Sequence, residues 1–394
     1  MQFMGTAATA LVAPGMASAG KYSWEEVESP SSSVLYDVTM TQEGPYAVGA
    51  GGDVRARRVD GWERVLDKGP TVKSNPLRSC DVTSDGRNVW FAGGSGVIGQ
   101  YDVVEEQITD YSAPKDKTST WEAIAAVGEA GSERVGLVNG SGEFLTGTKT
   151  DAGGMNWGDV IKPGGGSSAK GIDFLDESVG YICDTTSKIY ETTDGGKSWT
   201  TIGLRGSGSV ALYGVTAASR DEIYVTGGDG SIFRYNGAVW TKTDAGGTIL
   251  HDIVWKDGDG LTGGGGGNLF DYRQIQGWNA EETPTAATFR GVALDTTGQF
   301  PSVAVGSSGT ILERGFYTST DPKDNELLID GSRETSERVD YVVEVDGAIE
   351  KGPRCESAER VTVDVRDGST ATGYVKGFID DFRFSGSITK IAVT

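Results

Sequence analysis

One short pattern recurs along most of this chain and constrains its fold more than any other feature. A small or acidic residue precedes Val or Ile at intervals of roughly 38–48 residues, close to the period of four-stranded repeat units in ring-shaped β folds. The seven occurrences are Asp37-Val38, Asp81-Val82, Ala123-Ile124, Gly171-Ile172, Gly214-Val215, Asp252-Ile253 and Gly291-Val292. Apolar runs such as Tyr46–Gly49 and Val303–Gly306 follow, each bounded by glycine-rich turns. We therefore predict repeated antiparallel strands; the alternative is a β-sandwich with accidental regularity.

Aromatic residues indicate how the repeats close. A tryptophan follows the third strand of most repeats, and Tyr111 takes this place in the second. These tryptophans are Trp62, Trp157, Trp199, Trp240 and Trp278. The seventh repeat, which runs through Ile311–Gly315, has no such residue, but Tyr22–Val27 stands before the first repeat and resembles Gly61–Val65. We predict that this N-terminal strand completes the last repeat, which would remove an open sheet edge.

The octet Thr192–Trp199 carries the most specific motif, Thr-Thr-Asp-Gly-Gly-Lys-Ser-Trp. Glycine permits the positive φ of a tight turn, and the aspartate can accept backbone N–H bonds within it. The octet resembles the Asp-box of BNR-repeat proteins, which recurs once per blade of a β-propeller. The matching positions are Thr192, Asp194, Gly196, Ser198 and Trp199. The resemblance implies an all-β fold, a β-propeller, and a structural role for these five residues. With the seven repeats and the N-terminal strand, we predict a seven-bladed β-propeller closed by that strand.

The ends of the chain differ from the repeats. Residues 1–19 contain a weakly hydrophobic run and Ala17-Ser18-Ala19, the core and cleavage site of an export signal. The segment resembles a twin-arginine signal without its arginine pair; the alternative is a disordered N-terminus. The propeller is expected over residues 20–316, and a polar linker over 317–325.

Residues 326–394 are predicted to form a small β-sandwich, because valine-rich alternation is interrupted by turns at Asp346-Gly347 and Asp367-Gly368. Thr372–Gly377 and Asp381–Thr389 resemble the C-terminal module of secreted haloarchaeal proteins. That resemblance implies no catalytic or ligand-binding residues for this module.

Charge and composition exclude several classes of function. The chain has 56 acidic and 35 basic residues, a net charge of −21, which opposes binding to nucleic acid or anionic lipid. Acidic residues scattered through turns are typical of a halophilic surface. No apolar run is long enough to cross a membrane, and neither a cofactor nor a metal site is predicted, since Asp257–Gly260 lacks the further ligands of a calcium loop. Cys80, Cys183 and Cys355 show no pairing pattern and are expected to be buried apolar residues.

Catalysis is not expected. His251 is the only histidine, which argues against triads and most metal sites. Sialidases share the Asp-box propeller and use three arginines with a Tyr–Glu pair; here only Arg290 and Arg78 fit the arginine positions. A carbohydrate-active hydrolase of this type, using Tyr213 and Glu122, is the alternative from another class.

The closer resemblance is to non-catalytic propellers of the photosystem-assembly-factor type, which are protein-binding platforms. We expect a non-enzymatic, exported binding, adhesion or scaffold protein of a halophilic archaeon, secreted or at the cell surface, with a protein or surface glycan as partner. A virion surface spike of a haloarchaeal virus is the alternative within this class.

A candidate binding site follows from the variable positions of the repeat. Two residues before the apolar Val or Ile, chemically different side chains occur. They are Tyr36, Cys80, Glu122, Lys170, Tyr213, His251 and Arg290. In a propeller such positions lie at the rim of the central channel, so all of these except Cys80 are our predicted ligand-binding residues. Alternatively, the positions vary because they are exposed and unconstrained.

Overall fold

The computed structural model describes residues 10–11, 23–204, 209–273, 277–297, 299–314, 325–330, 339–351, 363–366, 368–375, 379–384 and 388–393. They belong to two compact units, Ser23–Gly315 and a unit that contains Phe316–Thr394. The described elements are strands in both units, with short 3-10 turns in Ser23–Gly315, so the all-β prediction is confirmed. Of the signal-like segment 1–19, only Ala10–Leu11 (β1) is described. The linker 317–325, apart from Asn325, lies outside the described residues, as does Cys355.

The described residues of Ser23–Gly315 form seven four-stranded antiparallel sheets. The first three are β3 (Leu35–Thr41), β4 (Gly44–Gly49), β5 (Val54–Arg58) and β6 (Gly61–Leu66); β7 (Leu77–Val82), β8 (Asn88–Gly93), β9 (Ile98–Asp102) and β10 (Gln107–Asp110); β11 (Trp121–Val127), β12 (Arg134–Asn139), β13 (Phe144–Lys149) and β14 (Met155–Trp157). The next three are β15 (Ala169–Phe174), β16 (Gly180–Asp184), β17 (Ile189–Thr192) and β18 (Thr200–Thr201); β19 (Leu212–Ser219), β20 (Glu222–Gly227), β21 (Ser231–Tyr235) and β22 (Trp240–Asp244); β23 (Leu250–Lys256), β24 (Asp259–Gly264), β25 (Leu269–Arg273) and β26 (Gly277–Glu281). The seventh contains β27 (Phe289–Ala293), β28 (Ser302–Gly306), β29 (Ile311–Arg314) and β2 (Glu25–Glu26).

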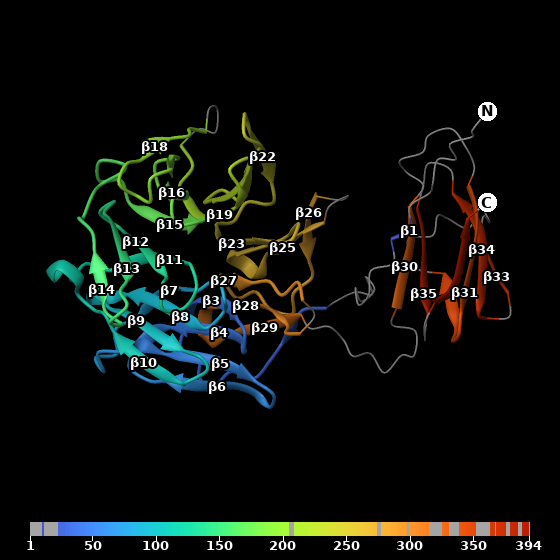
Figure 1. Ribbon diagram of the computed structural model, residues 1–394, viewed down its shortest axis with the longest axis horizontal. Helices are drawn as coiled ribbons and strands as arrows, with labels where there is room; N and C mark the ends of the chain where they lie inside the picture. The colour runs from blue at the N-terminus through green and yellow to red at the C-terminus, as the bar shows by residue number, and fades with distance from the viewer. Residues whose placement is uncertain are drawn as a thin grey trace. The chain divides into compact units, whose positions relative to one another are not determined.

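The first strands of the sheets contact one another in sequence order. Each of β3, β7, β11, β15, β19 and β23 touches the next, β23 touches β27, and β27 touches β3 again (Figure 1). The seventh sheet joins both ends of this unit, because β2 pairs with β29 and the Val27 N–H donates to the Ile311 carbonyl at 3.1 Å. Trp24, directly before β2, is 2% exposed.

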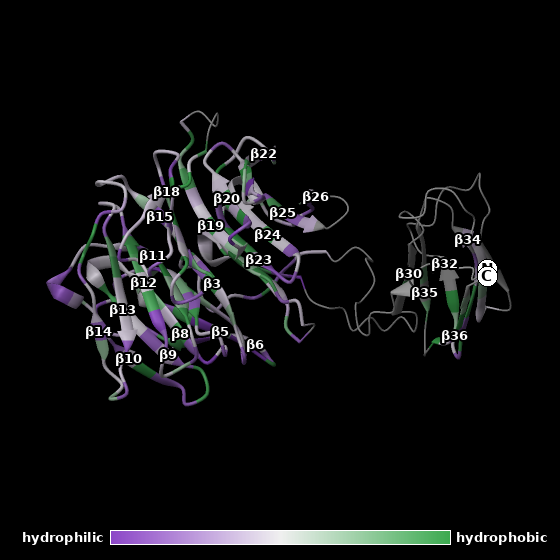
Figure 2. Ribbon diagram, turned by 45° about the horizontal axis from the view of Figure 1, so that its top comes forward, coloured by the Kyte–Doolittle hydropathy of each residue, from purple (hydrophilic) through white to green (hydrophobic). Residues whose placement is uncertain are grey.

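Burial explains the apolar runs of the sequence. The second strand of a sheet, such as β4, β8 or β28, is buried along its whole length, since neighbouring sheets cover both of its faces. Outer strands such as β10 are exposed. Figure 2 shows hydrophobic residues along the strands and hydrophilic residues in many connecting loops. Cys80 and Cys183 are buried free thiols, as predicted.

The turn Thr192–Trp199 has the expected local geometry. Asp194 accepts bonds from the Ser198 N–H at 2.9 Å and the Ser198 hydroxyl at 2.6 Å, and these bonds lower the pKa of its carboxyl to about 2. The Gly196 N–H donates to the Thr192 hydroxyl at 2.8 Å, with Gly196 at φ 84°. Trp199 packs edge-on against Phe144. The motif therefore closes a hairpin and anchors it to the neighbouring sheet.

The C-terminal unit contains two four-stranded sheets. One has the order β1, β30 (Asn325–Asp330), β35 (Ile379–Phe384), β32 (Ile349–Lys351); the other has β33 (Val363–Arg366), β34 (Thr370–Val375), β31 (Val339–Val345), β36 (Ile388–Val393). Leu327 and Phe382 of the first sheet share one apolar cluster with Tyr341 and Val343 of the second. The sheets thus pack face to face as a sandwich. In the described part of the chain, no helix has the length and apolar character needed to span a membrane.

Candidate functional site

The first strand of each of the seven sheets in Ser23–Gly315 is irregular at the same place. In the first sheet, Leu35 and Asp37 pair with consecutive residues of β4, so Tyr36 between them has no direct partner. Such a β-bulge turns a side chain out of the regular alternation of its strand. The residues skipped in this way are Tyr36, Arg78, Glu122, Lys170, Tyr213 with Gly214, His251 and Arg290.

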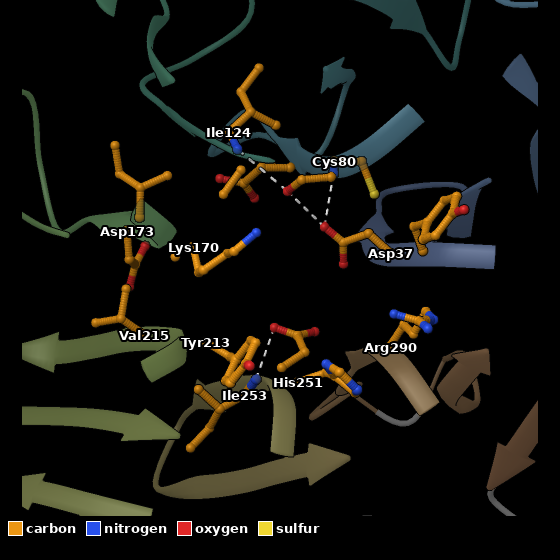
Figure 3. Close-up of a pocket in the computed structure, with 18 of the residues that line it drawn as sticks. Asp37, Cys80, Ile124, Lys170, Asp173, Tyr213, Val215, His251, Ile253 and Arg290 are labelled. Carbon is orange, nitrogen blue, oxygen red and sulfur yellow. Dashed lines mark hydrogen bonds between the residues drawn. The ribbon is translucent and has the colours of Figure 1, made fainter. Parts of the chain in front are cut away.

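These bulges surround a central cavity of about 250 Å³, to which all seven first strands contribute. Figure 3 shows Lys170, Tyr213, His251 and Arg290 around this space, with the side chain of Lys170 reaching into it. The structure thus brings together the six residues selected from the sequence, Tyr36, Glu122, Lys170, Tyr213, His251 and Arg290.

In the second sheet, the variable position predicted from the sequence, Cys80, is wrong. The bulged residue there is Arg78, because Leu77 and Ser79 pair with consecutive residues of β8. Cys80 borders the cavity but is 7% exposed and packs in an apolar cluster, and burial raises the pKa of its thiol well above the usual value. The pattern Asp81-Val82 is therefore shifted by two residues from its counterparts. The signal that could have found Arg78 is the buried Leu77 before it, which matches Leu35.

Tyr36 lies against two arginines from the neighbouring sheets. The Cζ atom of Arg78 lies 4.4 Å from the centre of the Tyr36 ring, and that of Arg290 lies 5.8 Å from it. Among the described residues, the buried Nε atoms of both arginines have no hydrogen-bond partner. Guanidinium groups are attracted to the face of an aromatic ring, so Tyr36 orients both groups without neutralising either charge.

The other bulged side chains contact each other in pairs. The Lys170 ammonium lies 3.0 Å from the Glu122 carboxylate, and the rings of Tyr213 and His251 meet edge to face at 5.6 Å between centres. Burial, with a smaller effect from Arg290, lowers the pKa of His251 to about 4, so the imidazole is neutral at pH 7. Glu122 and Tyr213, the pair considered for glycosidase chemistry, thus have different nearest partners.

Four aspartates line the same cavity and tie adjacent sheets together. Asp37 accepts from the Cys80 N–H at 2.9 Å, Asp81 from the Ala126 N–H at 2.7 Å, Asp173 from the Ala217 N–H at 2.7 Å, and Asp252 from the Val292 N–H at 2.8 Å. Burial raises the pKa of all four, to about 7 for Asp81 and about 6 for Asp252.

The sequence pattern included three of these aspartates as repeat framework but did not show that they link neighbouring sheets. The described residues contain no group of three or more His, Cys, Asp or Glu side chains placed to hold a metal ion.

Comparisons with solved structures show the fold. The structure is similar to YCF48 bound to D1 peptide, with a TM-score of 0.59 and 14% identity over 77% of this chain and 99% of that chain. It is also similar to the WD40 β-propeller domain of Doa1 (TM-score 0.58, 13% identity, 75% and 96% covered) and to U3-55K (TM-score 0.61, 8% identity, 75% and 99% covered). No protein-family model and no curated protein matches the sequence. The unit Ser23–Gly315 therefore has a β-propeller fold.

Proposed function

We propose that the seven sheets are the blades of one closed propeller and that β2 completes the seventh blade. Two observations support this proposal. The contacts of the first strands return from β27 to β3, and β2, which precedes the first sheet in sequence, pairs with β29. A closed ring leaves no blade edge for unwanted strand pairing.

On this ring, we propose a non-enzymatic platform that binds a protein or peptide at the mouth of the central cavity. The observation that carries the proposal is that one repeated bulge presents seven side chains of five residue types to a single cavity, while the frame around them repeats. Ligand sites commonly combine a concave frame with a few convergent polar groups. One of the similar structures has a peptide bound, as its name says.

The proposed setting is extracellular, as a secreted or cell-surface protein of a halophilic archaeon. The net charge of −21 supports a salt-rich environment and opposes a nucleic-acid partner. A surface glycan and a virion surface role remain the alternatives for partner and setting. A screen of polysaccharides and sialosides for hydrolysis tests the absence of catalysis, and release of any sugar would overturn it.

Site-specific photo-crosslinking tests the binding site. The photoreactive amino acid benzoylphenylalanine replaces Tyr213 in the full chain, and a matched variant carries it at Val59, which is 99% exposed in the turn between β5 and β6. Both are incubated with an extract of the native cell envelope and with a random peptide library. We expect crosslinks from position 213 and none from position 59. Crosslinks from position 59 alone, or from neither, would contradict a binding site at the cavity mouth.

A further inference from the structure

We propose that the mouth of the cavity binds a carboxylate of an acidic peptide, held between Arg78 and Arg290 above the Tyr36 ring. This inference rests on the proposed peptide-binding function and names the chemistry of its ligand. These two arginines differ from the others in their hydrogen bonding.

Every other arginine whose side chain the structure describes donates hydrogen bonds within the protein. Within the described residues, Arg78 and Arg290 have neither a hydrogen bond nor an ion pair, only their contacts with the Tyr36 ring and the wall of the cavity. A buried donor without a partner destabilises the fold, and more so when it is charged. In a chain with net charge −21, acidic partners for an arginine are abundant, yet these two guanidinium groups have none among the described residues. A bound anion would explain why both are left unpaired at one site.

The geometry of the three residues suits a planar anion. They stand on β7, β3 and β27, which are adjacent first strands, and each occupies the bulge of its strand. Both guanidinium groups lie within 6 Å of the same ring, so their positions are fixed relative to each other before a ligand arrives. Arginine presents paired donors that match the two oxygens of a carboxylate.

The charges elsewhere around the cavity leave Arg78 and Arg290 as the place where an anion would bind. Lys170 is already paired with Glu122, and His251 is neutral at pH 7. Asp37, Asp81, Asp173 and Asp252 line the wall, and their oxygens already accept backbone hydrogen bonds. None of these four residues supplies a positive charge that could pair with an incoming carboxylate.

The size of the cavity favours a peptide over a whole small molecule. Sites for drug-sized ligands usually have volumes of roughly 300–1,000 Å³. A cavity of about 250 Å³ is smaller than that range, so it accommodates a projecting side chain or chain end. The remainder of the ligand would then lie across the rim, where it can contact Tyr213.

A peptide array tests the inference with the full chain. Each peptide that contains Asp or Glu is printed beside a twin with Asn or Gln, and each is printed with both a free and an amidated C-terminus. The first comparison identifies a side-chain carboxylate and the second a terminal one. Hyaluronan, whose carboxylates belong to a polysaccharide, is titrated in parallel.

Substitutions at the two arginines connect binding to the site. Arg78→Gln and Arg290→Gln are each expected to weaken binding of carboxylate peptides by roughly 10- to 100-fold, the loss of one charge-assisted interaction. Arg290→Lys retains the charge but loses the paired donors, so it should fall between wild type and Arg290→Gln. Arg220→Gln is the control, because Arg220 is an exposed arginine paired with Glu191 away from the cavity. Melting curves of all variants establish that they fold.

The outcomes separate the two proposals. Binding that depends on a carboxylate and on both arginines supports the inference. Peptides that bind equally well as amide twins, or that tolerate both arginine substitutions, overturn it and leave the platform function intact. If hyaluronan binds through the arginines and no peptide binds, the peptide assignment is wrong. If wild-type protein binds neither, the proposed function fails together with the inference.

Discussion

Replacing Trp24 with alanine tests the closure of the ring. Trp24 precedes the two-residue strand β2, and this short segment is the only part of the described chain that joins the N-terminal end of the unit to β29. If the ring closes here, stability of the whole propeller depends on this segment.

The structure sets the size of the effect. Trp24 is 2% exposed and shares an apolar cluster with Phe289, Leu261 and Leu312, so its removal leaves a cavity that the neighbouring sheets cannot easily fill. A buried Trp→Ala change costs roughly 3–5 kcal/mol. Loss of the contact with Arg314, whose Cζ lies 5.0 Å from the ring centre, adds about 0.5–1 kcal/mol. No hydrogen bond is lost, since the indole N–H has no partner among the described residues.

Urea denaturation followed by far-UV circular dichroism measures the change. We expect Trp24→Ala to lower the free energy of unfolding by at least about 3 kcal/mol, against less than about 0.5 kcal/mol for the control Val59→Ala, which alters an exposed side chain. A loss below about 1 kcal/mol would refute the reasoning that this segment closes the ring.

Three further predictions concern acid, salt and the turn Thr192–Trp199. Burial raises the folded-state pKa of Asp81 to about 7 and of Asp252 to about 6, so the folded protein binds these protons more tightly than the unfolded chain and stability should rise as pH falls from 8 toward 5. The lowered pKa of His251 opposes this rise below about pH 6.5, so the increase should be steepest near pH 7, and Asp81→Asn should reduce it there; urea melts that show no increase between pH 8 and 6.5 would contradict this. Raising salt from 0.1 to 1 M shortens the screening length from about 10 to about 3 Å, so melting temperature should increase for a chain of net charge −21; an unchanged value would indicate that the acidity is not a source of repulsion. Asp194→Ala should accelerate amide exchange at Ser198 and leave β2 unaffected, and an unchanged exchange rate at Ser198 would show that the side chain does not hold the turn.

The repeat could be read from the sequence because its physical causes are local. Buried second strands require continuous apolar runs such as Tyr46–Gly49, and tight turns require glycine, so both recur at each unit. The same holds for the turn around Asp194, whose hydrogen bonds all lie within a few residues. The three-residue strand β32 is too brief to form an alternating pattern, so no local signal marks it.

The site was predicted only in part, because it depends on register and on contacts between sheets. Arg78 was noted as an inward arginine but was left out of the binding residues, because aligning Asp81-Val82 with Asp37-Val38 put Cys80 in its place; pairing with β8 fixes the register two residues earlier. The role of Asp173 was also missed, since its partner Ala217 is in the next sheet and no local pattern marks that bond. Bulges place the site residues, and a bulge is visible only once the partner strand is known.

The central claim is that the bulged side chains at the cavity mouth bind the ligand. Its most direct test is the affinity of the triple variant Tyr36→Ala, Tyr213→Ala and Arg290→Ala for a peptide selected on the wild-type protein, measured by titration calorimetry beside a melting curve. The account predicts that binding is lost while the melting temperature stays within a few degrees of wild type, because all three side chains face the cavity and none belongs to an apolar core cluster. Full affinity in a folded triple variant would contradict the account and move the site to the outer edges of the blades or to the C-terminal sandwich.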